Sequence, residues 1–368
     1  MGFKCGIVGM PNVGKSTLFN ALTETAAAQA ANYPFCTIEP NVGEVAVPEA
    51  RLETLAALAK SAAIVPTRLN FVDIAGLVRG ASKGEGLGNQ FLANIREVDA
   101  IAHVVRCFED GEVTHVEGRI DPIADIETVE TELMLADLDS LERRLDGLER
   151  KARGNDKEAN EAKEALGLAN RALALLRQGK PARLTERKPD EEKAFHLLGL
   201  ITSLPVLYVC NVDEASAADG NEYSRSVEHK AASEGAAAIA ISAKIEAEIA
   251  LLGREERNEY LAALGLNEAG LDRLIRAGYG LLDLVTFFTA GPKEARAWTV
   301  TRGTKAPQAA GIIHSDFERG FIRAETIAYG DYVACGGEAG ARDAGKMRLE
   351  GKDYVVADGD VMHFRFGT

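Results

Sequence analysis

The feature that most constrains this chain is an eight-residue run near its start. Residues 9–16 read Gly-Met-Pro-Asn-Val-Gly-Lys-Ser, which matches the pattern G-x-x-x-x-G-K-[ST]. An apolar run over residues 5–8 precedes it, and a helical pattern over residues 17–21 follows it. Glycines at this spacing let backbone N–H groups turn toward phosphate oxygens at a helix N-terminus. The run therefore predicts a strand, a phosphate-binding loop (P-loop) and a helix that together bind a nucleotide.

The pattern around this run indicates an α/β fold. Short apolar runs that alternate with helical patterns are typical of buried parallel strands. Such runs occupy residues 5–8, 69–72, 100–108, 204–210 and 236–241. We expect a doubly wound, mainly parallel sheet of the P-loop NTPase type, with helices on both faces.

Two long helical patterns interrupt this alternation. Apolar residues spaced by four and three run from Met134 to Ala152 and resume from Ala162 to Leu176, with a turn sequence at residues 154–156 between them. The spacing predicts an antiparallel coiled-coil hairpin, and two ordinary amphipathic helices packed on the core are the alternative.

The sequence therefore predicts three parts in 368 residues, more than one small module. They are a nucleotide-binding domain (residues 1–127 and 200–283), a helical insertion (128–199) and a C-terminal domain (284–368). In the last part, short runs between Gly-rich turns predict strands and a small α+β fold. These runs are residues 297–301, 324–328, 332–334 and 361–366.

Five residues are candidates for the phosphate and metal chemistry. Lys15 is expected to reach the β- and γ-phosphates, and the Ser16 hydroxyl is expected to ligate Mg²⁺. Asp73 begins a D-x-x-G sequence after a predicted strand and is expected to hold Mg²⁺ through water, while the Gly76 amide senses the γ-phosphate. Thr37 is a candidate second hydroxyl ligand of Mg²⁺, and a solvated threonine is the alternative.

Several segments resemble a known family. Residues 9–17, 34–41 and 73–92 resemble the Obg-family translation-factor GTPases, and within them the Obg-like ATPase, or YchF, subfamily. Residues 306–317 and 345–354, with Ala297-Trp298-Thr299, are similar to the β-grasp-like TGS domain of that subfamily. The resemblance extends over essentially the whole chain and implies an ATP-binding hydrolase associated with ribosomes.

The base-recognition sequence departs from that of guanine-specific relatives, which use N-K-x-D. Here the corresponding residues are Asn211, Val212, Asp213 and Glu214. The lysine that covers the base is missing, and the longer glutamate displaces the acceptor of the guanine hydrogen bonds. We expect ATP to be preferred. A shift that lets Asp213 take the aspartate's place would leave a GTPase of the same fold.

The nucleotide is expected to contact the P-loop and two later loops. Ser242-Ala243-Lys244 resembles the remaining base-side loop of the family, and Asn12 is a candidate ligand of a monovalent cation such as K⁺, as in some related GTPases. The predicted nucleotide-binding residues are Asn12, Val13, Gly14, Lys15, Ser16, Thr17, Asn211, Val212, Glu214, Ser242, Ala243 and Lys244.

The catalytic group is less defined by the sequence. Leu77 follows D-x-x-G where Ras-like hydrolases place a water-orienting glutamine, so slow hydrolysis is expected. Lys15 and Gly76 are expected to act at the γ-phosphate. His115 lies in a polar stretch and is a candidate to orient or deprotonate water, with a solvated histidine as the alternative. His103 lies in an apolar run and is expected to be a buried strand residue.

The charge is distributed unevenly along the chain. The net charge is −14, yet residues 143–188 hold thirteen basic and seven acidic residues, a local charge of +6. Residues 283–368 are near −1, which leaves about −19 for the remainder. A basic hairpin suits RNA phosphate contacts, and a solvated coiled-coil face is the alternative. With the resemblance, this predicts the ribosome and its RNA as partners of the hairpin and TGS domain. A nucleotide-gated binding module with incidental turnover is the alternative.

Cysteine and hydropathy patterns bear on the compartment. The five cysteines include no C-x-x-C pair, which argues against a disulfide framework or a structural zinc site. No apolar run reaches 18 residues, and the start lacks a signal-peptide pattern. We expect a cytoplasmic protein with no membrane partner and no disulfide partner.

Overall fold

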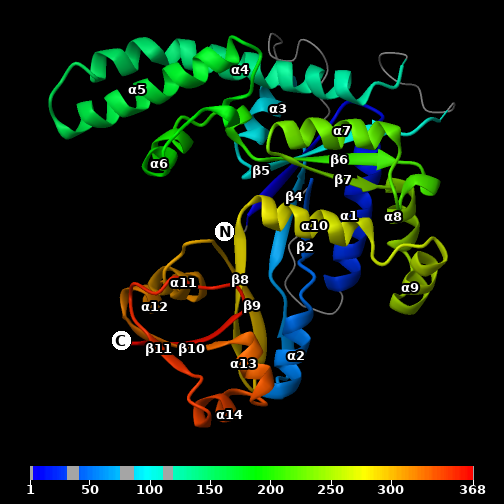
Figure 1. Cartoon of the computed structure of the whole chain (residues 1–368), viewed down its shortest axis with the longest axis vertical. Coiled ribbons are helices and arrows are strands. Elements are labelled where there is room, and N and C mark those ends of the chain that lie inside the picture. The colour runs from blue at the N-terminus through cyan, green and yellow to red at the C-terminus, as the bar shows by residue number, and fades with distance from the viewer. Residues whose placement is uncertain (1–2, 31–40, 75–86, 111–118, 368) are drawn as a thin grey trace. The chain divides into compact units, whose positions relative to one another are not determined.

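The computed structural model describes residues 3–30, 41–74, 87–110 and 119–367. Their contacts divide the chain into two units (Figure 1). Unit 1 comprises Met1–Val45 and Asn70–Gly278, and unit 2 comprises Ala46–Leu69 and Tyr279–Thr368. The two units have separate six-stranded sheets.

The sheet of unit 1 confirms the predicted α/β fold. β1 pairs in parallel with β4 and β5, and β5, β6 and β7 continue the parallel order. β5 and β6 are fully buried, as expected for central strands of a parallel sheet. In sheet order the strands are β2 (Val42–Ala46), β4 (Arg68–Asp73), β1 (Lys4–Val8), β5 (Ala100–Cys107), β6 (Val206–Val212) and β7 (Ala237–Ile241).

Helices cover this sheet on both sides, and Figure 1 shows α4 and α7 on one side of β6 and β7, with α1 and α8 on the other. α7 packs on β6 and β7, and α1 packs against α8. Because the connections after β1, β5 and β6 leave from the same end of a parallel sheet, the loops that they form lie near one another. The helices are α1 (Lys15–Ala30), α3 (Leu87–Ile95), α4 (Pro122–Lys151), α5 (Lys157–Leu176), α6 (Glu192–His196), α7 (Glu222–Ser233), α8 (Ala243–Ile249), α9 (Arg254–Ala263) and α10 (Gly270–Leu281). Four short 3₁₀ helices are η2 (Ala182–Leu184), η3 (Pro189–Glu191), η4 (Ile201–Ser203) and η5 (Glu214–Ser216).

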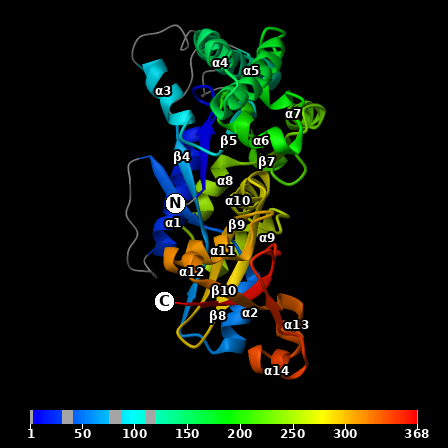
Figure 2. The ribbon, with the colours of Figure 1, turned by 90° about the vertical axis from the view of Figure 1, so that its left-hand side faces the viewer.

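The predicted hairpin is formed by α4 and α5, which lie side by side (Figures 1 and 2). α4 begins six residues before the expected boundary at residue 128, and the Asp121 carboxylate accepts a hydrogen bond from the Ala124 N–H as its N-cap. α4 packs on β5 and α7, and its apolar residues from Met134 to Leu148 share a core with α5. The shared core confirms most of the predicted seam, although Leu168 and Ala172, rather than Leu166, lie in it.

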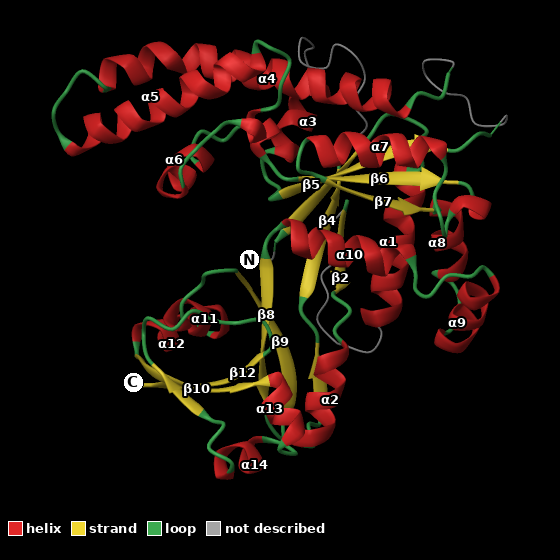
Figure 3. Cartoon of the chain, in the orientation of Figure 1, coloured by secondary structure: helices red, strands yellow, loops and turns green. Residues whose placement is uncertain are grey.

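Unit 2 is the α+β part, with strands and helices distinguished in Figure 3. One apolar cluster lies on α11 and another on α2 and α13. In sheet order the strands are β11 (Arg348–Glu350), β10 (Phe321–Ala328), β12 (Asp360–Phe366), β8 (Leu284–Ala290), β9 (Glu294–Thr301) and β3 (Ala63–Val65). The helices are α2 (Ala50–Ala59), α11 (Ala306–Ile313), α12 (Ser315–Arg319), α13 (Tyr329–Ala334) and α14 (Glu338–Asp343).

Two sequence expectations differ from the structure here. Residues 46–69 were expected in the nucleotide-binding domain, but β3 pairs with β9 and α2 packs on β8 and β9, so this segment belongs to unit 2. Residues 332–334 were expected as a strand but lie in α13, where Tyr332 is buried in the core. A three-residue apolar run does not distinguish a strand from a buried helical turn.

Within the described ranges, we find no helix with both the length and the apolar character that crossing a membrane requires.

Candidate nucleotide-binding site

The P-loop joins β1 to α1 and depends on residues that tolerate unusual backbone geometry. Asn12 and Gly14 have φ values of 62° and 90°, in the left-handed region. At Gly9, a Cβ atom would lie 2.6 Å from the Val104 carbonyl oxygen, so no larger residue fits without a backbone shift. The loop therefore delivers the free N–H groups of the first turn of α1, which favour an anion.

Lys15 and Asp73 meet beside this loop. Asp73 ends β4, directly opposite Ile7 of β1, and its carboxylate forms an ion pair with the Lys15 ammonium. Both side chains are largely buried. Ser16 is exposed in the first turn of α1. A hydroxyl and a carboxylate are the hard oxygen donors that Mg²⁺ prefers, so these residues fit that ion.

Asn211, at the end of β6, connects the P-loop to the second base-side loop. Its Nδ2 donates to the Val13 carbonyl oxygen at 2.9 Å, and its Oδ1 accepts from the Ala243 N–H at 2.9 Å. The side chain is buried. Its two hydrogen bonds hold the P-loop and the start of α8 together.

Both acidic residues that follow Val212 already have partners. The Asp213 carboxylate accepts hydrogen bonds from the N–H and hydroxyl of Ser216, and it caps η5. Glu214 forms an ion pair with Lys244 at 3.1 Å, and this hydrogen bond raises the pKa of Lys244. Ser242, which precedes Lys244, has a buried hydroxyl with no hydrogen-bond partner among the described residues.

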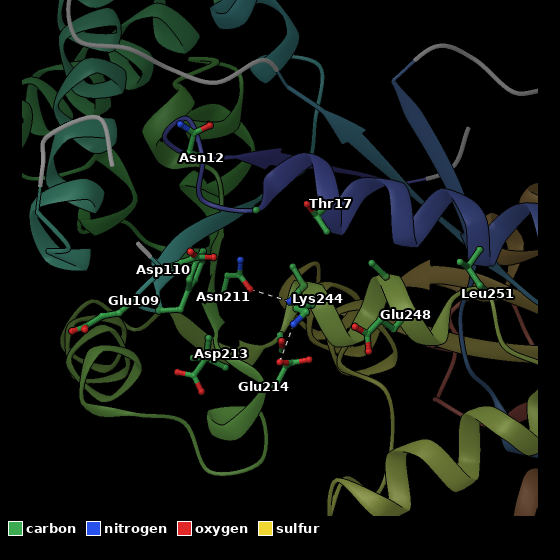
Figure 4. A pocket seen from close by; sticks show the side chains of 16 residues that line it. Asn12, Thr17, Glu109, Asp110, Asn211, Asp213, Glu214, Lys244, Glu248 and Leu251 are labelled. Carbon is green, nitrogen blue, oxygen red and sulfur yellow. Dashed lines mark hydrogen bonds and ion pairs between the residues drawn. The ribbon is translucent and has the colours of Figure 1, made fainter. Parts of the chain in front are cut away.

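These loops surround a cavity of about 710 Å³ (Figure 4). Its volume is within the range of small-molecule sites. Nine predicted nucleotide-binding residues line it: Asn12, Gly14, Thr17, Asn211, Val212, Glu214, Ser242, Ala243 and Lys244.

Comparisons with known proteins place this geometry in a family. Residues 4–139 match a family model described as 50S ribosome-binding GTPase, and residues 284–367 match the YchF-GTPase C-terminal family, whose description is "Protein of unknown function". Proteins named Ribosome-binding ATPase YchF from Haemophilus influenzae and Bacillus subtilis are 57% and 56% identical over the full length of both chains. The structure of the Schizosaccharomyces pombe YchF GTPase is 39% identical, with a TM-score of 0.88 over 99% of this chain and 98% of that one.

The chain belongs to the YchF family. Its fold, with a P-loop α/β unit and a C-terminal α+β unit, is that of the solved YchF structure. The resemblance expected from the sequence is confirmed.

Some residues predicted for the YchF-family site lie beside the cavity rather than in its lining. Val13 of the P-loop is buried, Lys15 is directed to Asp73, and Ser16 lies in the first turn of α1. Three further predicted residues, Thr37, Gly76 and His115, lie outside the described residues, as does Leu77. Their roles remain predictions.

The sequence reasoning missed two groups of lining residues. Phe108, Glu109 and Asp110 follow β5, and Ala247, Glu248 and Leu251 come from α8 and its end. The first group could have been found, because β5 neighbours β6 and the carboxyl ends of parallel strands meet at one edge. No sequence motif marks the second group. Leu251, for example, is an apolar residue that a sequence pattern would assign to the core, yet it is 76% exposed.

His103 is a buried β5 residue, as expected. Its ring lies 5.7 Å from that of Tyr208, and burial lowers its pKa from 6.5 to about 4. The imidazole is therefore neutral at physiological pH. It does not line the candidate cavity.

Proposed function

We propose that this YchF-family chain binds ATP in preference to GTP and hydrolyses it with Mg²⁺ while associated with the ribosome in the cytoplasm. The observation that carries the base preference is the engagement of Asp213 and Glu214. A guanine reader must accept two hydrogen bonds from the base with one carboxylate. Asp213 caps η5 and Glu214 pairs with Lys244, so neither carboxylate is free for that role.

The engagement of Asp213 also argues against the GTPase alternative. A register change that turned Asp213 toward a base would break its two hydrogen bonds to Ser216. The relatives from Haemophilus influenzae and Escherichia coli are named ribosome-binding ATPases, which supports the same preference here.

In this proposal the phosphates lie at the P-loop. The N–H groups at the start of α1 and the Lys15 ammonium bind the β- and γ-phosphates, so Lys15 exchanges Asp73 for a phosphate. Ser16 and Thr37 would hold Mg²⁺ directly and Asp73 would hold it through water, where the ion would supply neutralisation of charge on the phosphate oxygens.

The remaining catalytic roles extend this proposal. The Gly76 amide would report the γ-phosphate, His115 would orient or deprotonate the attacking water, and Asn12 would ligate K⁺. With Leu77 in place of a glutamine, hydrolysis without a partner is slow.

Ribosome association is supported by the relatives' names and by the hairpin's charge. Six of its thirteen cations form ion pairs with carboxylates: Arg143, Lys157, Arg171, Arg177, Arg183 and Arg187. The others form no ion pair with described residues, and Arg153 and Lys163 lie near the turn of the hairpin. We propose that these contact ribosomal RNA, with the TGS domain as a second contact.

Titration calorimetry with ATP and GTP in the presence of Mg²⁺ tests the nucleotide preference. We expect ATP to bind at least about tenfold more tightly, because the N1–H and N2 amino donors of guanine would lie in the site without a carboxylate acceptor, a cost that adenine, which has no N1–H, does not incur in full. Equal affinity for both nucleotides, or tighter GTP binding, contradicts the proposal.

A further inference from the structure

A groove on the hairpin lies outside the nucleotide site. It runs between α4, α5 and the short helix α6, and its volume is about 1000 Å³. Figure 1 shows α6 beside the two long helices. Apolar side chains line it: Leu148, Ala162, Ala165, Leu197 and Leu198. Leu197 is 74% exposed, an unusual position for a leucine unless something covers it.

The two long helices contribute opposite charges to this groove. α4 supplies the cations Arg143, Arg144, Arg150 and Lys151, and α5 supplies the anions Glu158, Glu161 and Glu164. None of the ion pairs found among the described residues joins a cation of this α4 set to an anion of this α5 set. The groove therefore has a basic wall, an acidic wall and apolar residues between them.

We propose that this groove binds an amphipathic helix of a partner protein on the ribosome. The acidic flank of this partner helix lies beside α4, and its basic flank lies beside α5. Small or branched apolar residues of the partner helix, between the two flanks, contact Leu197 and Leu148. Helix recognition by a groove uses this arrangement of apolar anchors and flanking charges.

The dimensions agree with a short helical segment. From Arg143 to Lys151, α4 rises about 12 Å. A helix of that length and about 10 Å in diameter occupies about 900 Å³, which is close to the groove volume of about 1000 Å³. Two turns of a third helix fit beside α4 and α5.

The charge pattern favours a protein helix over RNA at this groove. A phosphate backbone beside Arg150 and Lys151 would also lie near the carboxylates of α5, which repel it. The exposed Leu197 has no use in a phosphate contact. This inference rests on the proposed ribosome association and names the kind of component that the groove contacts.

Charge reversal of each wall separates the two kinds of partner. The probe is purified 70S ribosomes, and the measurement is co-sedimentation of the full chain. Glu158→Lys with Glu161→Lys makes both walls basic, and Arg150→Glu with Lys151→Glu makes both walls acidic. We expect each pair to weaken binding about tenfold, because each repels one flank of the helix. Leu197→Asp, at an exposed position, is expected to weaken binding similarly.

The control pair is Glu255→Lys with Glu259→Lys, two exposed carboxylates of α9 that lie outside the hairpin and do not line the groove. We expect this control to change the affinity for ribosomes by less than about twofold, because it leaves both walls of the groove intact. If Glu158→Lys with Glu161→Lys strengthens sedimentation or leaves it unchanged, the groove contacts phosphate or nothing, and the inference is wrong. If the unmodified chain fails to sediment with ribosomes, the proposed ribosome function itself is wrong and the inference fails with it. Circular dichroism of each variant verifies that the hairpin is folded.

Discussion

Asn211 shows how one residue can organise a site formed by distant segments. Its amide joins the Val13 carbonyl to the Ala243 N–H. Asn211→Ala leaves both groups buried without these partners, and each such loss costs about 1–3 kcal/mol. We therefore expect ATP affinity, measured by calorimetry, to fall at least about tenfold. Asn20→Ala, at an exposed position of α1, serves as the control, and unchanged affinity in the Asn211 variant contradicts the proposed role.

Glu214 and Val212 determine the base preference in our proposal. The double variant Val212→Lys with Glu214→Asp rebuilds the N-K-x-D pattern and releases Lys244 from its ion pair. We expect the ratio of GTP to ATP affinity to rise at least about tenfold, since a hydrogen-bond reader discriminates strongly once its geometry is met. Glu214→Gln alone breaks the ion pair without creating a reader and is expected to leave GTP binding weak. A rise in GTP affinity in that single variant would mean that Lys244 pairing alone blocks guanine.

His103 couples stability to pH. Its pKa is about 4 in the folded chain and 6.5 when unfolded, with burial as the main cause; Glu130 opposes this shift, and Arg183 and Lys230 add to it. Because the folded pKa is lowered, its contribution to stability is complete above pH 6.5 and is lost as the pH falls toward 4. Between pH 7.5 and 4.5 the loss is about 2–3 kcal/mol. Urea unfolding followed by circular dichroism should show this loss in the parent and not in His103→Phe; equal pH dependence in both refutes it.

At the scale of elements, hydrophobic periodicity predicted the helices and strands that local sequence determines. The strands around the P-loop and the apolar seam of α4 and α5 follow from spacing alone. Residues 46–69 could not be assigned this way, because β3 joins unit 2 through pairing with β9, more than 200 residues away. The residues that line the site fall into the same two groups. Sequence motifs predicted Gly14 and Asn211, whereas Leu251 lines the cavity only because of where α8 is placed in the fold.

The base of the hairpin is held by buried charges. Arg183 pairs with Glu130 of α4 and Glu234 at the end of α7. Arg183→Met leaves two largely buried carboxylates with Lys230 as their only remaining ion-pair partner among the described residues. We therefore expect a loss of about 2–3 kcal/mol in unfolding free energy, below the roughly 3–5 kcal/mol of a fully uncompensated buried charge. The matched control is Arg177→Met, whose pair with Glu142 is exposed and whose loss costs less than about 1 kcal/mol. Similar urea midpoints for the two variants would show that the buried network does not stabilise the hairpin.

At the scale of the whole molecule, the net charge of −14 is distributed unevenly between the parts of the chain. Most of the negative charge belongs to the nucleotide-binding part, while the hairpin carries unpaired cations near its turn and a two-signed groove beside them. Taken alone, the negative net charge of the chain argues against RNA as a partner. A hairpin that was basic on all sides would likewise argue against a two-signed protein helix as a partner. The distribution allows each at a different place on one hairpin.

The Lys15–Asp73 ion pair provides the test of nucleotide control over the whole molecule. In our proposal, phosphate binding draws Lys15 away from Asp73, with which it forms an ion pair in this structure, so we expect the pair to differ between the free and bound chains. We expect ribosome co-sedimentation of the parent to differ at least about threefold between no nucleotide and a non-hydrolysable ATP analogue, a coupling of typical size. Lys15→Ala should sediment equally in both conditions, and Lys293→Ala, an exposed cation of unit 2, should behave like the parent. If the Lys15 variant keeps the nucleotide dependence, the P-loop does not control ribosome binding, and the hairpin and TGS domain act independently of nucleotide.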